Sequence, residues 1–310
     1  MRRDAAKFLF FICVIVGRMG WAAPAAETVS TNTPPPAAAA PGTNSAPAGT
    51  IQTNTPLEVT STTNATYKIP ELQILQFPVP LTKEAKFAIA NSKNPVVEYA
   101  LAAIAVPRNF DPKFPTPILL VSATSDGDAS SIRAMHSFTN MALRLGWMVI
   151  AADGPYGKPP NDNPQWRWAM ISALLDHMHK NWPQSRRWPI AAAGVSGGGK
   201  WSGVVGAVLA KQGYNLIGVF MAAVNQDFPS QAAKMYEPAM RYKATPLFLS
   251  SGTDDQVATP EHHNEVKESL LHNGFSTVRL ETFKGGHIVS PLELRKALNW
   301  FIEIYAKPHE

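Results

Sequence analysis

The feature that most constrains this chain is the pentapeptide Gly-Val-Ser-Gly-Gly at 194–198, which stands between two segments of different character. Residues 190–193 are apolar, as in a short buried strand, and residues 201–210 have the composition of a helix. A chain that passes from a strand into a helix at a serine must turn sharply there. The serine then takes a strained backbone conformation, and its neighbours must be small.

Such a turn would raise the hydroxyl of Ser196 above the end of the strand, where it can act as a nucleophile. The backbone N–H of Gly197 would point from the start of the helix towards the negative charge that develops on an attacked carbonyl oxygen. A glycine-rich turn that happens to contain a serine is the alternative interpretation, because the pentapeptide is common by chance. A catalytic role therefore requires partners elsewhere in the chain.

Two later segments have the character of such partners. A serine hydroxyl is a weak nucleophile near neutral pH, so it needs a base and a group that orients the base. Asp254 and Asp255 follow one strand-like run and the glycine at 252, and His287 follows another run and two glycines. Because the carboxyl ends of parallel strands meet at one edge of a sheet, the acid and the histidine are expected beside the serine.

The order Ser196, Asp255, His287 resembles that of the α/β-hydrolase family, and its secreted esterases and dienelactone-hydrolase-like members are the most similar. The motifs that carry the resemblance are Gly-Val-Ser-Gly-Gly-Gly at the serine, Gly-Thr-Asp-Asp-Gln-Val at the acid and Gly-Gly-His at the histidine. The family's acid is the third residue after the glycine, which favours Asp255 over Asp254. The resemblance covers residues 96–306 and implies a catalytic triad that needs no metal and no cofactor.

The resemblance also implies a second oxyanion donor in the loop that follows the strand expected at 118–122. The family often has a His-Gly pair in this loop, whereas this chain has Ala-Thr-Ser-Asp-Gly at 123–127. The backbone N–H of either Thr124 or Ser125 would then donate to the oxyanion. We take Ser125 as the first choice and Thr124 as the alternative.

Apolar runs alternate with helix-like segments through residues 67–310, which predicts one α/β domain. Its expected architecture is the α/β-hydrolase fold, with a mostly parallel central sheet and helices on both faces. Strands are expected at 96–106, 118–121, 147–152, 190–193, 216–223, 247–251 and 277–283, and helices at 130–145, 165–182, 201–210, 260–272 and 291–305.

The N-terminal part has a different composition. Residues 1–26 have a basic start, a nine-residue apolar run at 8–16 and small residues near 23–25, which is typical of a secretory signal peptide. Residues 27–66 are rich in Pro, Ala and Thr and predict a disordered linker. We therefore expect an exported protein, periplasmic or extracellular, that meets a membrane only through the signal segment if this is uncleaved.

The charge and the cysteine content argue against a nucleic-acid partner and against chemistry that uses a thiol. Residues 1–25 hold four of the 28 basic and one of the 23 acidic residues, so removing them leaves 24 and 22 and lowers the net charge from +5 to about +2. No basic run favours nucleic acid as a partner. The only cysteine, Cys13, lies in the predicted signal peptide, so a processed chain has no thiol nucleophile and no thiolate metal ligand.

Two further groups of residues require an interpretation. His262 and His263 are adjacent on a predicted helix and point about 100° apart, so we expect a solvated helix face rather than a metal site. A long loop after 153 is followed by Trp166 and Trp168. These two aromatic side chains are candidates for a substrate pocket, although such side chains more often pack in a core.

The sequence therefore predicts an exported serine hydrolase that cleaves a small-molecule or polymer-borne carboxylic ester through an acyl-enzyme. One alternative is a peptidase of the prolyl-oligopeptidase type, a family that usually carries a propeller domain where this chain has only a linker. The other alternative is a catalytically inactive α/β-hydrolase scaffold that serves for binding. The acyl and alcohol groups of the substrate do not follow from the sequence.

Overall fold

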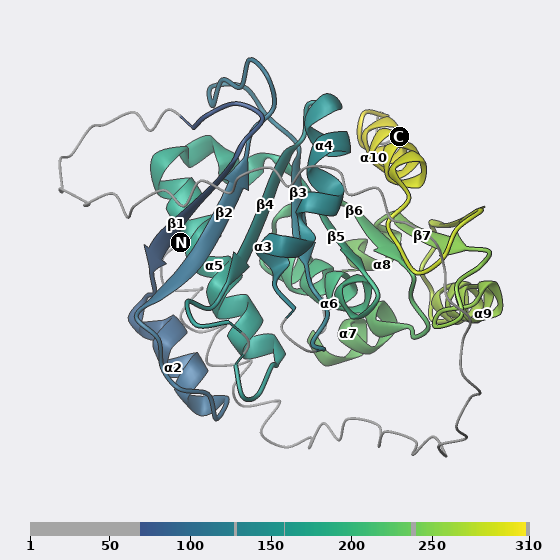
Figure 1. Cartoon of the computed structure of the whole chain (residues 1–310), viewed down its shortest axis with the longest axis horizontal. Coiled ribbons are helices and arrows are strands. Elements are labelled where there is room, and N and C mark those ends of the chain that lie inside the picture. The colour runs from purple at the N-terminus through teal and green to yellow at the C-terminus, as the bar shows by residue number, and fades with distance from the viewer. Residues whose placement is uncertain (1–68, 127–128, 158, 237–239, 308–310) are drawn as a thin grey trace, which may run out of the picture. The chain divides into compact units, whose positions relative to one another are not determined.

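An eight-stranded sheet in the order β1-β2-β4-β3-β5-β6-β7-β8 forms the centre of the domain that the structure describes (Figure 1). The computed structural model describes residues 69–126, 129–157, 159–236 and 240–307. Strands β3 to β8 pair in parallel, whereas β1 pairs antiparallel with β2, and β2 pairs antiparallel with β4. The predicted mostly parallel sheet is therefore confirmed, with an antiparallel edge that the sequence did not predict.

The elements have the following bounds. The strands are β1 (Ile74–Pro80), β2 (Tyr99–Ala105), β3 (Ile118–Ser122), β4 (Met148–Asp153), β5 (Pro189–Val195), β6 (Asn215–Ala222), β7 (Leu247–Gly252) and β8 (Val278–Phe283). The helices are α2 (Lys83–Asn91), α3 (Ser131–Ala134), α4 (His136–Arg144), α5 (Pro164–Asn181), α6 (Gly197–Lys211), α7 (Phe228–Tyr236), α8 (Arg241–Ala244), α9 (Pro260–His272) and α10 (Pro291–Tyr305). A 3₁₀ helix, η1, covers Pro183–Arg187.

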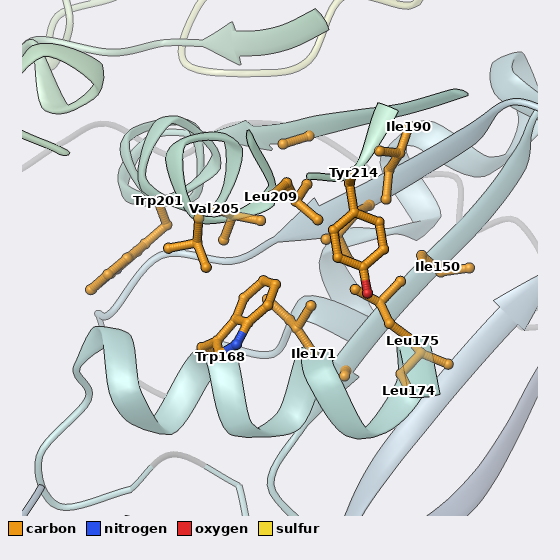
Figure 2. Packing of buried hydrophobic residues seen from close by; sticks show 14 of the residues in the cluster. Ile150, Trp168, Ile171, Leu174, Leu175, Ile190, Trp201, Val205, Leu209 and Tyr214 are labelled. Carbon is orange, nitrogen blue, oxygen red and sulfur yellow. The ribbon is translucent and has the colours of Figure 1, made fainter. Parts of the chain in front are cut away.

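Helices cover both faces of the sheet, as predicted, and the two faces bury separate cores. Alternate residues of β3 show the division, because Ile118 and Leu120 belong to one core, and Leu119 and Val121 belong to the other. The first core includes side chains of α5 and α6, which Figure 2 shows packed against each other. The second core includes side chains of α4 and α10. Burial on both faces explains why the central strands are continuous apolar runs rather than alternating ones.

The helix expected at 130–145 is divided into α3 and α4 at Met135. Three donors converge on the carbonyl of Met135, namely the N–H of Phe138 at 3.0 Å, the N–H of Thr139 at 2.9 Å and the hydroxyl of Thr139 at 2.7 Å. A threonine hydroxyl that bonds the carbonyl four residues earlier often bends a helix. The apolar spacing across this region is that of one helix, so it gave no indication of the break.

The predicted signal peptide at 1–26 and the predicted linker at 27–66 lie outside the described residues. Within the described ranges, no helix is both long enough and apolar enough to cross a bilayer.

One close contact joins the sheet to α10. A Cβ atom placed on Gly218 of β6 would lie 2.4 to 2.6 Å from three atoms of the Phe301 ring, and Phe301 is fully buried. We expect Gly218→Ala to lower the free energy of unfolding by about 1–3 kcal/mol, because overpacking forces neighbours off their preferred rotamers. Denaturant unfolding of the single variants and of Gly218→Ala combined with Phe301→Leu measures this. If Gly218→Ala lowers the free energy of unfolding by the same amount with Phe301 as with Leu at position 301, the expected clash with the ring is contradicted.

A half-buried histidine makes the stability depend on pH. His179 of α5 contacts the hydroxyl of Ser185 at 2.8 Å through Nδ1 and the hydroxyl of Tyr214 at 3.1 Å through Nε2. Burial, with the nearby charge of Arg186, lowers the pKa of His179 from 6.5 to about 4. Between these two values the unfolded chain binds a proton that the folded chain does not bind, so stability falls as the pH falls.

We therefore expect the Tm to fall between pH 7 and pH 5, and to fall less in His179→Gln, which keeps hydrogen-bonding groups but cannot be protonated. Thermal unfolding of both proteins across this range tests the expectation. His272→Gln, at an exposed histidine of α9, is the matched control and should keep the slope of the natural chain. An unchanged slope in His179→Gln would show that another group causes it.

Candidate active site

Ser196 occupies a strained turn between β5 and α6. Its φ is 57° and its ψ is −130°, a region that residues other than glycine rarely adopt and that costs about 1–3 kcal/mol. The backbone N–H of Ser196 donates to the carbonyl of Ala222, at the end of β6, over 2.9 Å. The sharp turn expected from the sequence is present, and the neighbouring strand holds its backbone.

The glycines around Ser196 are required by close backbone approaches. A Cβ at Gly194 would lie 2.1 Å from the carbonyl oxygen of Gly198, and a Cβ at Gly198 would lie 2.3 Å from the carbonyl oxygen of Ser122. Both obstacles are backbone atoms, so no change of rotamer can relieve them. The pentapeptide therefore keeps β5, α6 and the end of β3 in contact at the serine.

Asp255 and His287 form a pair at the same edge of the sheet. Nδ1 of His287 lies 2.8 Å from one carboxylate oxygen of Asp255 and 3.0 Å from the other. The backbone N–H groups of Val257 and Ala258 also donate to Asp255, at 2.8 and 2.9 Å. Burial by itself raises the pKa of Asp255, but these N–H groups and His287 outweigh it and hold the pKa below its usual value. The carboxylate beside Nδ1 favours the tautomer of His287 that carries its proton on Nδ1, in which Nε2 is the acceptor.

Interlocked turns bring this pair together. The N–H of Asp254 donates to the carbonyl of Gly285 over 2.8 Å, and a Cβ at Gly252 would lie 2.4 Å from the carbonyl oxygens of Gly285 and Gly286. The turn after β7 therefore packs directly on the turn after β8. Asp255 is 2% exposed and contacts His287, whereas Asp254 is exposed and bonds the neighbouring hydroxyl of Thr253. Of the two acids left open by the sequence, the structure brings Asp255 to the histidine.

Ser196 lies at this edge, at the end of β5, two strands away from β7. Among the residues that the structure describes, its hydroxyl makes no hydrogen bond to His287. Catalytic hydrogen bonds of this kind often tighten only when substrate binds. The carboxylate of Asp255 and the imidazole of His287 are thus paired in the structure, and Ser196 is presented separately by the strained turn.

The loop after β3 contacts the serine turn through Thr124. A Cβ at Gly197 would lie 2.3 Å from Oγ1 of Thr124, so the two residues touch. Within the described ranges, the N–H of Thr124 has no acceptor, and its hydroxyl bonds Asp126 at 2.8 Å. The hydroxyl of Ser125 instead accepts from Nε1 of Trp201 over 2.7 Å. Within the same ranges the backbone N–H of Ser125 also has no acceptor, so the contact with Gly197 is the observation that favours Thr124, the alternative in the sequence analysis, over Ser125 as the second oxyanion donor.

Asp153, at the end of β4, binds the residues where this loop meets α3. Its carboxylate accepts from the hydroxyl of Ser130 at 2.6 Å and from the N–H groups of Ser131 and Ile132 at 2.9 and 3.0 Å. The negative charge lies at the beginning of α3, where it is favourable. The sequence placed Asp153 only at the end of a strand, and nothing in its neighbours indicated that it binds a loop more than twenty residues earlier.

A cavity of about 490 Å³ lies next to Thr124. Its walls include the loop after β4, the first turns of α5, and α3, with Tyr156, Trp166 and Met170 among the lining residues. Both tryptophans belong to the first core, where Trp168 packs against α6 (Figure 2), and Trp166 alone of the two also lines the cavity. Neither Ser196 nor the Asp255–His287 pair is among the described residues that line the cavity.

The expectation of a solvated face at His262 and His263 was wrong for His263, which is fully buried. Its Nε2 accepts from the N–H of Val224 over 3.1 Å, and its Nδ1 lies 3.1 Å from the carbonyl of Thr259, so the proton is on Nδ1. Burial is the main cause that lowers its pKa, and the ring is neutral. His263 lies on the inner face of α9, three residues before the buried Val266. In the described part of the chain, no group of three or more His, Cys, Asp or Glu residues could hold a metal ion.

Comparisons with known proteins establish the fold. No protein-family model matches the sequence, and no curated protein matches it. The structure is similar to that of a ferulic acid esterase, with a TM-score of 0.52, 14% identity, and coverage of 75% of this chain and 98% of that chain. It is also similar to an esterase from Pyrococcus furiosus, with a TM-score of 0.50, 15% identity, and coverage of 76% and 91%. The chain has the α/β-hydrolase fold.

The Asp255–His287 pair generates a direct prediction. Asp255→Asn keeps the size of the side chain but removes the charge that holds the His287 proton on Nδ1, so we expect kcat for an ester substrate to fall by about 10⁴-fold, as in other serine hydrolases. Asp254→Asn is the matched control and should stay within about twofold of the natural chain. Steady-state kinetics with p-nitrophenyl acetate measures both. Equal losses in the two variants would contradict the assignment of Asp255.

Proposed function

We propose that this protein is a serine hydrolase that cleaves carboxylic esters through an acyl-enzyme on Ser196, His287 and Asp255. The observation that carries the proposal is the position of three groups at one edge of the sheet, namely a strained serine and a histidine that is paired with a buried carboxylate. Strain at a serine is retained only where the surrounding structure enforces it, and such positions cluster at functional sites.

In the proposed reaction, the hydroxyl oxygen of Ser196 attacks the ester carbonyl while Nε2 of His287 takes its proton. Asp255 keeps the ring in the correct tautomer and stabilises the imidazolium. The N–H groups of Gly197 and Thr124 donate to the oxyanion. His287 then returns the proton to the leaving alcohol, and a water molecule that His287 activates releases the acid and restores the serine.

An ester is a better supported substrate than a peptide. Two solved structures that share this fold, described above, are esterases by name. They make an ester the first choice by analogy of fold. No feature of the described site favours a prolyl-oligopeptidase-like peptidase. A catalytically inactive scaffold is disfavoured because such a scaffold has no need for both the strained serine and the acid–histidine pair.

The proposal includes export. Its support is the basic and apolar segment at 1–26 and the Pro/Ala/Thr-rich segment at 27–66, which suit a signal peptide and a linker. A periplasmic or extracellular hydrolase would meet esters of small molecules or esters carried by polymers. Fractionation of cells that express the full chain, followed by mass analysis of its N-terminus, tests the location and the cleavage.

The test of the chemistry is covalent labelling of the serine. We expect a fluorophosphonate probe to label the natural chain, and Ser196→Ala to lose both the labelling and the hydrolysis of p-nitrophenyl acetate while its Tm stays unchanged or rises. A natural chain that is neither labelled nor active would be an inactive scaffold. A Ser196→Ala variant that is still labelled would place the nucleophile elsewhere.

The same assay identifies the substrate class. A panel of acetyl, butyryl and feruloyl esters, acetylated xylan and peptide amides, each tested with the natural chain and with Ser196→Ala, separates esters from peptides and small esters from polymer-borne ones. Cleavage of peptide amides with little ester hydrolysis would favour the peptidase.

A further inference from the structure

The side chain of Arg167, in the first turn of α5, binds the backbone of the loop that carries Thr124. One terminal nitrogen donates to the carbonyl of Ala123 over 2.7 Å. The other donates to the carbonyl of Thr124 over 3.2 Å and to the hydroxyl of Ser125 over 3.3 Å. Three consecutive residues of the loop therefore bond a single guanidinium group.

The guanidinium is itself held on two other sides. Asp162 accepts from Nε over 2.8 Å and from the same terminal nitrogen that bonds Thr124 and Ser125, which makes the bidentate ion pair that arginine forms best. The group also lies 4.5 Å from the ring of Trp201, whose Nε1 bonds Ser125. The side chains of Arg167 and Asp162 are only 12% and 8% exposed. A buried ion pair of this kind is fixed in position, because moving either partner leaves the other charge without compensation.

Because the peptide group is planar, the contacts of Arg167 also determine the direction of the N–H of Thr124, the proposed oxyanion donor. The carbonyl of Ala123 and the N–H of Thr124 belong to one peptide group, which is trans, so they point in opposite directions. When Arg167 holds that carbonyl, the N–H of Thr124 must point away from the guanidinium. Thr124 touches Gly197, and its N–H has no acceptor within the described ranges. A donor bonded to the carbonyl also polarises the amide and strengthens the N–H as a donor.

We propose that Arg167, braced by Asp162, is a positioning residue that orients the N–H of Thr124 towards the oxyanion and thereby sets kcat. The proposal rests on the proposed function of Ser196 and goes beyond it, because Arg167 bonds neither the serine nor the acid–histidine pair. It acts on the transition state through one peptide group. Its loss therefore affects the rate of the chemical step more than the binding of the substrate.

The experiment compares Arg167→Ala, Arg167→Lys and Arg144→Ala. Arg144 has an exposed side chain on α4 and does not line the cavity, so it is the matched control for the loss of a positive charge. Active sites are first counted by titration with a fluorophosphonate, so that unfolded protein does not enter kcat. We then measure kcat and KM with p-nitrophenyl acetate and the inhibition constant of phenylboronic acid, whose adduct with Ser196 mimics the tetrahedral intermediate.

We expect Arg167→Ala to lower kcat per active site by about 10²-fold, the lower end of the loss of one oxyanion donor, with KM within about threefold. Phenylboronic acid should bind more weakly in proportion. Arg144→Ala should change neither value by more than about twofold. Because the cavity borders the guanidinium, methylguanidinium should restore part of kcat in Arg167→Ala and have no such effect on the natural chain.

Arg167→Lys keeps the charge but cannot bond both carbonyls and Asp162 at once, and it tests the proposal if the alanine variant does not fold. We expect it to fold and to lose at least about tenfold in kcat. An Arg167→Lys variant with kcat and boronate affinity within twofold of the natural chain would overturn the proposal. So would an Arg167→Ala variant that loses only stability. Both outcomes differ from failure of the proposed function, in which the natural chain itself is neither labelled nor active.

Discussion

The hydrogen bond from the N–H of Ser196 to the carbonyl of Ala222 ties the strained turn to the centre of the sheet. A serine with φ of 57° relaxes unless its surroundings enforce the conformation. Here β5 and β6 are central parallel strands, covered on both faces by buried side chains, so the acceptor cannot move away from the donor. The glycines at 194 and 198 let α6 and the end of β3 approach the turn closely. The apolar core thus supports a conformation that the local sequence alone would not keep.

Much of the site could be predicted because each of its parts is encoded locally. The serine turn, the acid turn and the histidine turn are short motifs with glycines at the positions where the backbone has no room, and parallel strands bring their ends to one edge. The resemblance to the family's acid turn favoured Asp255 over Asp254, and in the structure it is Asp255 that contacts His287.

The features of the site and fold that were not predicted depend on contacts between segments far apart in the sequence. Arg167 bonds a loop more than forty residues earlier, and Asp153 bonds the start of α3. The buried state of His263 follows from the face of α9 that packs on the sheet, which adjacent histidines do not reveal. Strand β1 contains two prolines and was not expected, although an edge strand tolerates prolines because one side of it needs no ladder bonds.

The contact of Gly252 with the carbonyl oxygens of Gly285 and Gly286 has a mechanical consequence. Because a Cβ at Gly252 would overlap these two carbonyl oxygens, the turn that carries Asp255 packs directly on the turn that carries His287, and we expect the two side chains to move together. The alignment of carboxylate and imidazole is then insensitive to such motions. The distance that a bound substrate can still change is the one between the imidazole of His287 and the hydroxyl of Ser196. In this fold, the adjustment of the site to a substrate is therefore concentrated in that one distance.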